Sequence, residues 1–241
     1  MADGPTKALG REEAKRLIVG LMVSGELLPD SPVSERSLAE RLNLGRTPVR
    51  EALHDLRRDG LIGIEPTRGS HVRRLGLDDL REIFEVRYAL EALAAAMAAT
   101  RGPTARLCEL HNAFSDFSGD TLDDDEAAYY RRIGHELHSE IVAAARNTLL
   151  SRQYEQVRLM IEISLSLTRD QEASRVRSTI SEHLAISSAI LARDPVAAQT
   201  AMQAHLREGH LTRMRILTEM PPFSLAEPFA VATQTAARPP N

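Results

Sequence analysis

Several residue types are scarce or missing in this 241-residue sequence, and each absence excludes a class of protein. Cys108 is the single cysteine, so neither an internal disulfide framework nor a cysteine-rich zinc site can form. No apolar run reaches about 18 residues, and the N-terminus has no apolar signal core. We therefore expect no membrane span and a cytoplasmic protein. Neither a phosphate-binding loop nor a dinucleotide fingerprint is present, so no organic cofactor is expected.

Tryptophan is missing and aromatic residues make up only 4% of the chain, whereas hydrophobic residues make up 43%. The core must therefore be built from alanine, leucine, isoleucine, valine and methionine. This composition favours packed helices over an aromatic-rich sandwich of strands, and we predict a mainly α fold.

The charge is unevenly distributed along the chain, although the net charge is only −4. Residues 1–75 carry 13 basic against 11 acidic residues, and the remaining residues carry 17 against 23. Residues 36–74 alone contain nine arginines and five acidic residues. A basic N-terminal third suggests a nucleic-acid module attached to a second domain. On composition alone, a surface of mixed charge is an equally good interpretation.

Three helices are predicted in the N-terminal third. The first spans about 6–24, and the second follows Ser34, a good N-cap residue. The third is expected to begin with Thr47 as the cap and Pro48 in the first helical position, and to end at Gly60.

Two short apolar segments, 61–64 and 70–73, are predicted to form a hairpin, because the residues between them are rich in turn formers. Two helices, a tight turn and a trailing hairpin are the parts of a winged helix-turn-helix. We assign this DNA-binding fold to residues 1–75.

The third predicted helix has two faces. Its apolar face carries Val49, Ala52, Leu53 and Leu56. The opposite face carries Arg46, Arg50, His54 and Arg57. Arginine can pair with guanine edges in the major groove or clamp phosphates, and Thr47 at the helix start can donate to a phosphate. The competing interpretation is a solvated face whose arginines pair with Glu51, Asp55 and Asp59.

Two further positions can reach DNA. Arg36 opens the second helix, where it can contact the backbone or a base edge. Arg68 and Gly69 lie at the tip of the predicted hairpin, and an arginine beside a residue without a side chain can enter a minor groove.

After residue 75 the strand signals stop, and amphipathic stretches separated by helix-ending residues take over. They predict six helices, at about 77–101, 104–117, 124–146, 148–169, 171–193 and 195–218. Six helices in this length predict an all-helical bundle over residues 76–219. The tail, 220–241, contains five prolines and is predicted to be disordered.

Three histidines lie on apolar stripes of three different predicted helices: His138, His183 and His205. Imidazoles that meet in a bundle core need partners, and a divalent metal ion would supply them. Three separate, satisfied core histidines are the simpler alternative. His111 and His210 do not fit the pattern and are interpreted as surface or packing residues.

Two segments of the N-terminal third are distinctive, RTPVREAL at 46–53 and the wing RGSHV at 68–72. Through them, residues 8–74 closely resemble the winged-helix domain of the GntR family of bacterial transcription regulators. The resemblance implies that Arg36, Arg46, Arg50, Arg68 and Gly69 touch operator DNA and that Thr47 contacts phosphate.

Three further runs, EVRYALE at 85–91, HSEI at 138–141 and EHLAI at 182–186, belong to a second resemblance. Over residues 77–215 the chain resembles the FCD ligand-binding domain, which defines the FadR subfamily of GntR regulators. This implies a divalent metal held by His138, His183 and His205, with zinc, nickel, cobalt or manganese as candidates. A small carboxylate effector would complete its coordination, and Arg87 is the candidate for binding the carboxylate.

One position departs from that domain's pattern. An aspartate is usual four residues before His138, and this chain has Gly134 there, beside His135. Either three histidines and water hold the metal, or His135 replaces the aspartate, or the site is lost and the effector binds directly.

We expect a regulator, most simply a repressor, that binds a palindromic operator as a homodimer and is released by a small carboxylate. A helical metal-dependent enzyme acting on a small organic acid is the alternative, although no catalytic residues stand out. A nucleoid-type architectural protein without an effector is a second rival.

Overall fold

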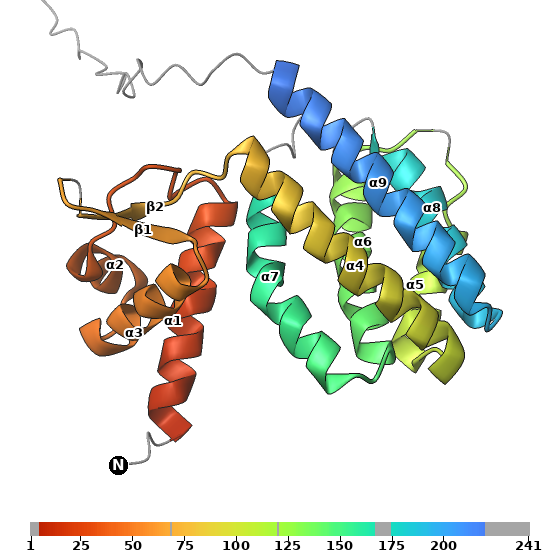
Figure 1. The fold of residues 1–241 in the computed structure, drawn as a ribbon, viewed down its shortest axis with the longest axis horizontal. Coiled ribbons are helices and arrows are strands. Elements are labelled where there is room, and N and C mark those ends of the chain that lie inside the picture. The colour runs from red at the N-terminus through yellow and green to blue at the C-terminus, as the bar shows by residue number, and fades with distance from the viewer. Residues whose placement is uncertain (1–4, 68, 120, 167–174, 220–241) are drawn as a thin grey trace, which may run out of the picture.

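The computed structural model describes residues 5–67, 69–119, 121–166 and 175–219, and it has two groups of elements side by side (Figure 1). The N-terminal group has the predicted order of three helices and a hairpin. Its elements are α1 (Pro5–Val23), α2 (Glu35–Leu42), α3 (Arg46–Arg58), β1 (Ile62–Glu65) and β2 (Gly69–Val72). The mainly helical fold and the winged helix-turn-helix are therefore confirmed.

The ends of α2 and α3 follow from their capping residues. Ser34 caps α2 by accepting a hydrogen bond from the backbone N–H of Ser37, as predicted. For α3, the prediction that Thr47 is the cap is wrong, because the helix starts two residues earlier, at Arg46, with Gly45 as N-cap and no side-chain cap. Pro48 is therefore the third helical residue, where its missing N–H costs nothing because the first N–H groups have no partner inside a helix.

The hairpin is antiparallel, with Ile62 opposite Val72 and Glu65 opposite Gly69. The segment before α2 joins it, since the N–H of Val33 donates to the carbonyl of Ser70 at 2.8 Å. This backbone contact holds the wing against the segment that leads into α2, at the start of the helix-turn-helix.

The C-terminal group is the predicted six-helix bundle. Its helices are α4 (Leu77–Arg101), α5 (Ala105–Ser115), α6 (Asp124–Ala144), α7 (Thr148–Ser166), α8 (Val176–Leu191) and α9 (Pro195–Glu219). The long helices α4 and α9 lie side by side along their length (Figure 1). The predicted break between the fourth and fifth helices of the bundle, and the predicted disordered tail 220–241, lie outside the described residues.

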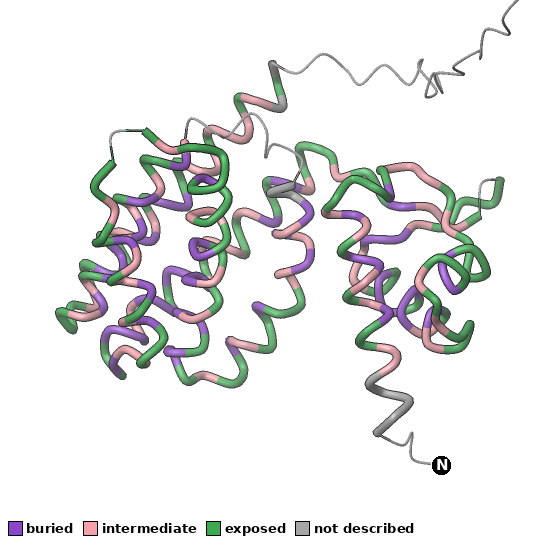
Figure 2. Tube along the Cα trace, turned by 180° about the vertical axis from the view of Figure 1, so that it is seen from behind, coloured by how far each residue is buried: buried purple, intermediate pink, exposed green. Residues whose placement is uncertain are grey.

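Each group has its own apolar core, and buried positions run through both (Figure 2). One helix contributes to both cores. Leu159 and Ile163 of α7 lie in the N-terminal core together with residues of α1 and α3, whereas Leu150 and Ile161 belong to the core of the bundle. The helix α7 therefore connects the bundle to the winged helix-turn-helix by direct packing. No helix in the described residues is long and apolar enough to cross a membrane.

Candidate functional site

The two faces predicted for α3 are present. Its apolar residues Val49, Ala52, Leu53 and Leu56 are buried, and Arg46, Thr47, Arg50, His54 and Arg57 are exposed. Nε of Arg50 lies 3.1 Å from a carboxylate oxygen of Glu35 at the start of α2. Both side chains of this pair are solvent-exposed, so the interaction is weak and can be exchanged for a phosphate or a base edge.

Two acidic residues at the C-terminal end of α3 pair with α1, and not with the exposed arginine face as the competing interpretation has it. Asp55 is buried and pairs with Arg11 of α1, and Asp59 pairs with Lys15 of α1 at 2.8 Å. Within α3, Arg58 also pairs with Asp55, at 3.3 Å. These pairs hold α1 against α3, on the side away from the exposed arginine face.

The other predicted DNA contacts are on the surface or outside the description. Arg36 is exposed and pairs with Glu40 at 2.9 Å within α2. Gly69 has a φ of 70° and open space where a Cβ would lie, so a glycine suits the tip of the wing. Arg68 lies outside the described residues.

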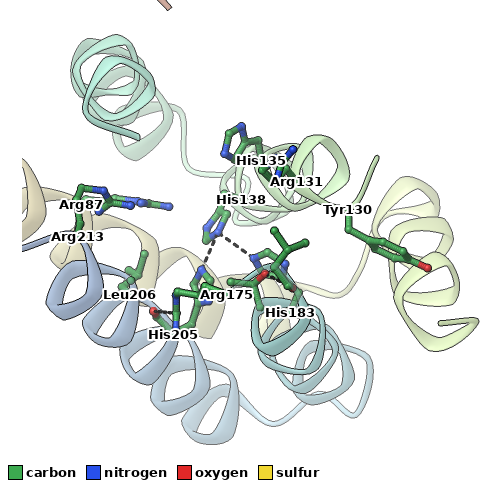
Figure 3. A pocket seen from close by; sticks show the side chains of 13 residues that line it. Arg87, Tyr130, Arg131, His135, His138, Arg175, His183, His205, Leu206 and Arg213 are labelled. Atoms are coloured by element: carbon green, nitrogen blue, oxygen red, sulfur yellow. Dashed lines mark hydrogen bonds between the residues drawn. The ribbon is translucent and has the colours of Figure 1, made fainter. Parts of the chain in front are cut away.

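The three histidines predicted from the apolar stripes meet in the core of the bundle. His138 of α6, His183 of α8 and His205 of α9 are all buried, and their candidate ligand atoms lie within 4.8 Å of one another. The Nε2 of His138 lies 3.1 Å from that of His205 and 3.4 Å from that of His183 (Figure 3). The alternative of three separate core histidines is therefore wrong, because the rings share one site.

Two carboxylates, one fully buried and one partly buried, orient two of the rings. Glu91 of α4 accepts a hydrogen bond from Nδ1 of His138, and Glu182 of α8 accepts one from Nδ1 of His205 at 2.6 Å. With the proton on Nδ1, each ring presents an unprotonated Nε2 to the cluster. Two lone pairs 3.1 Å apart repel each other, and a cation between them removes the repulsion.

The protonation of the cluster suits a metal site. Burial, and then the neighbouring rings, hold the pKa values of His183 and His205 well below the usual range, so both rings are neutral at pH 7. Burial would raise the pKa of Glu91, but Arg87 and His138 reverse the effect and hold it below its usual range. The carboxylate that orients His138 is thus ionised.

The distances also fit a metal ion. Zinc–imidazole bonds of about 2.1 Å in tetrahedral geometry place ligand nitrogens about 3.4 Å apart. The Nε2 separations of 3.1 and 3.4 Å are close to that value. Three converging Nε2 atoms, with a carboxylate on the Nδ1 of two of the rings, are therefore the donor set that a divalent ion requires.

The two residues that the sequence left ambiguous are now placed. His135 is exposed and lies outside the cluster, although it lines the adjoining cavity. Gly134 lies directly under the ring of His183, and a Cβ there would lie 2.6 Å from its Cε1. The absent side chain at 134 is thus a condition for the position of His183.

A cavity of about 100 Å³ adjoins the histidines, several times the volume that one water molecule needs. Arg87, the predicted carboxylate ligand, lines it and donates from Nε to Glu91 at 2.7 Å. The remaining lining includes His135, Tyr130 and Thr179, and the further arginines Arg131, Arg175 and Arg213.

Sequence reasoning missed Glu91, Glu182 and Arg175. The four-residue spacing of Arg87 and Glu91 predicts an ion pair on one helix face, and Glu182 precedes His183 directly, so a signal was present for both carboxylates. Nothing in the sequence places Arg175 next to Glu182, because that contact, at 2.9 Å, depends on how the chain enters α8.

A winged helix-turn-helix with an exposed arginine face, packed against a helical domain that contains a cavity, is the architecture of a DNA-binding transcription regulator. Comparison with known proteins identifies the family. Residues 11–72 match the bacterial regulatory proteins of the gntR family, and residues 82–208 match the FCD domain. The chain belongs to the GntR family of transcription regulators, in the FadR-type subfamily with a C-terminal FCD domain.

Characterised relatives support this assignment. The HTH-type transcriptional repressor RspR of Escherichia coli (strain K12) is 28% identical over 186 residues, which cover 76% of this chain and 79% of RspR. The Glc operon transcriptional activator of the same strain is 27% identical over 245 residues, covering 87% and 94%. The solved structure of E. coli McbR/YncC has the same fold, with a TM-score of 0.72 at 18% identity over 90% of this chain and 100% of that one. The family consists of regulators, so the enzyme alternative is not supported.

Proposed function

We propose that this protein is a cytoplasmic repressor that binds a palindromic operator as a homodimer and leaves it when a small carboxylate binds in the FCD domain. The observation that carries the DNA-binding part is the exposed face of α3, which has Arg46, Arg50 and Arg57 on the side opposite its buried residues. In a helix-turn-helix this face enters the major groove, and a two-fold dimer places two such helices on two half-sites. The domain division at residue 75 is part of the same proposal.

His138, His183 and His205 hold a divalent metal ion in this proposal, and Arg87 holds the effector carboxylate. When bound, the ion supplies a Lewis-acid site for a carboxylate oxygen. The absence of a side chain at Gly134 leaves the protein with three ligands from the described residues, so coordination positions stay open for the effector.

The link between the bundle and the DNA-binding domain is α7, which packs against α4, the helix that carries Arg87 of the cavity lining. Tyr154 of α7 is buried in the bundle core, and Leu159, less than two turns further along the same helix, is buried in the N-terminal core. At the end of α3, a Cβ on Gly60 would lie 2.9 Å from Cε of Met160, so the domains touch without spare room. A shift of α7 relative to the bundle would therefore move the recognition helix.

The test of DNA binding is selection from a random pool of double-stranded DNA by the full-length protein, followed by fluorescence anisotropy on the selected sequence. We expect a palindromic site and an affinity that falls steeply with salt. Arg50→Ala is expected to lose about tenfold or more in affinity for the selected site, the cost of a bidentate base contact. If Arg50→Ala binds that site normally, the assignment of α3 is wrong.

The control is Arg81→Ala. Arg81 is also an exposed arginine paired with an acidic residue, with 59% of its side chain accessible against 65% for Arg50, but it lies on α4 of the bundle. Its removal changes the net charge equally, so we expect only a small, sequence-independent effect.

A further inference from the structure

The cavity beside the histidine cluster has a strongly basic lining. Four guanidinium groups line it, and no carboxylate is among the described residues of the lining: the arginines are Arg87, Arg131, Arg175 and Arg213. A small cavity with this lining favours an anion, and four cations around about 100 Å³ exceed what one carboxylate needs.

Two of these arginines are connected to the histidine cluster through carboxylates. Arg87 donates to one oxygen of Glu91 at 2.7 Å, and the other oxygen of Glu91 accepts from His138. The side chain of Glu91 is fully buried, and that of Arg87 is 12% accessible. A group that pulls on Arg87 therefore acts on the carboxylate that orients His138.

A second connection of the same chemistry reaches another ring. Arg175 donates to Glu182 at 2.9 Å, and the same oxygen of Glu182 accepts from His205 at 2.6 Å. The side chain of Arg175 is 13% accessible, similar to that of Arg87. Arg87 comes from α4 and Arg175 from the entry to α8, so the two cations approach the rings from different elements (Figure 3).

We propose that the effector is a short dicarboxylate, with one carboxylate bound by Arg87 and the other by Arg175. This inference rests on the proposed function and specifies its ligand. A guanidinium has five N–H donors, so an arginine that holds a glutamate can also donate to a second anion. Through Glu91 and Glu182, the two ends of the ligand act on His138 and His205 together. Ligand and metal therefore bind cooperatively, and each raises the affinity for the other by the same factor.

The probes are malonate, succinate and glutarate, with butyrate as the monocarboxylate that matches succinate in carbon number and inorganic phosphate as a different anion. Binding to the zinc-loaded, full-length protein is measured by calorimetry. We expect at least one diacid to bind about tenfold or more tightly than butyrate, because the second charge-assisted contact is absent from butyrate. Three results would each overturn the proposal. The first is equal affinity for the diacids and butyrate, and the second is tighter binding of phosphate than of any diacid. The third is no diacid binding, tested at about a tenfold excess over protein sites and at about 10 mM.

Variants of Arg175 separate recognition from mere structure. Arg175→Gln is expected to lower the affinity for the best diacid to that for butyrate, with butyrate binding nearly unchanged, and to abolish the effect of the diacid on zinc affinity. Arg175→Lys keeps a charge beside Glu182 and serves if the glutamine variant does not fold, which circular dichroism shows; it should retain part of the discrimination.

The control is Arg158→Gln. Arg158 also pairs with glutamates, Glu155 and Glu162, but it lies on α7 and does not line this cavity. We expect no change in diacid binding. An equal loss for butyrate and diacid in Arg175→Gln would show that Arg175 only supports the fold. These outcomes are distinct from failure of the proposed function, in which a bound acid leaves operator affinity unchanged.

Discussion

Replacing Gly134 by alanine tests whether the ring of His183 sits where the structure places it. The added Cβ would lie 2.6 Å from Cε1 of His183, whereas ordinary contacts begin at 3.4 Å, so the ring has to move by about 0.8 Å. Metal–ligand distances tolerate only about 0.2 Å. We therefore expect zinc affinity to fall by about 10- to 100-fold, the range seen when the support of a ligand is lost.

The effect on stability is predicted to be much smaller than the effect on metal binding. Alanine gains about 1 kcal/mol over glycine in a helix, and overpacking costs about 1–3 kcal/mol. The metal-free variant should thus lose at most about 2 kcal/mol of unfolding free energy. Zinc affinity is measured by calorimetry against a competing chelator, and stability by urea unfolding of chelator-stripped protein.

Gly20→Ala is the matched control, because Gly20 is a helical glycine of α1 with nothing within 4 Å of its Cβ position. It should gain stability, by about 1 kcal/mol, and leave zinc affinity unchanged. If Gly134→Ala binds zinc as tightly as the unaltered protein, the account of the three-ligand site is refuted.

Three further predictions concern stability, each measured by urea unfolding of metal-free protein. Glu91→Gln leaves two buried partners uncompensated and should cost about 3–5 kcal/mol; a loss below about 1 kcal/mol would contradict the buried ion pair. Leu159→Ala should cost about 2–5 kcal/mol at the contact between the domains, whereas Leu149→Ala, exposed on the same helix, should cost less than about 0.5 kcal/mol. The free energy of unfolding should also decrease as the pH is lowered below about 6.5. The unfolded chain then takes up protons on His183 and His205, whereas the folded protein does not, because the pKa values of both rings are lowered in it. That loss is at most about 1.4 kcal/mol per pH unit for each ring, and a flat profile between pH 7 and 5 would contradict the buried neutral rings.

Periodicity and capping were enough to predict most of the fold. The helix 77–101 was predicted with the bounds that α4 has, because glycine and proline mark its end clearly. The predicted start of α3 is wrong. A threonine before a proline is a common helix start, with the proline as the first helical residue, but proline is also tolerated as the third helical residue, where Pro48 lies. Local rules cannot choose between these two frames, since the choice depends on how α3 packs.

The histidine cluster was predictable only in part. Apolar residues three and seven positions from His138 and His183 show that these rings face inward, and the structure brings them together. The carboxylate partners of His138 and His205 cannot be assigned from the sequence, because contacts such as that of Glu91 with His138 join residues 47 positions apart. The sequence shows Gly134 only as a departure from the usual aspartate and leaves three alternatives open, and only the structure shows that the ring of His183 requires a residue without a side chain there.

The most direct test of the central claim is the metal content of full-length protein purified without a tag and without added metal. Elemental analysis should find about one divalent ion per chain, and none in the variant His183→Ala/His205→Ala, because that variant retains only one of the three converging nitrogens. No metal in the unaltered protein, even after loading with zinc or nickel, would contradict the account.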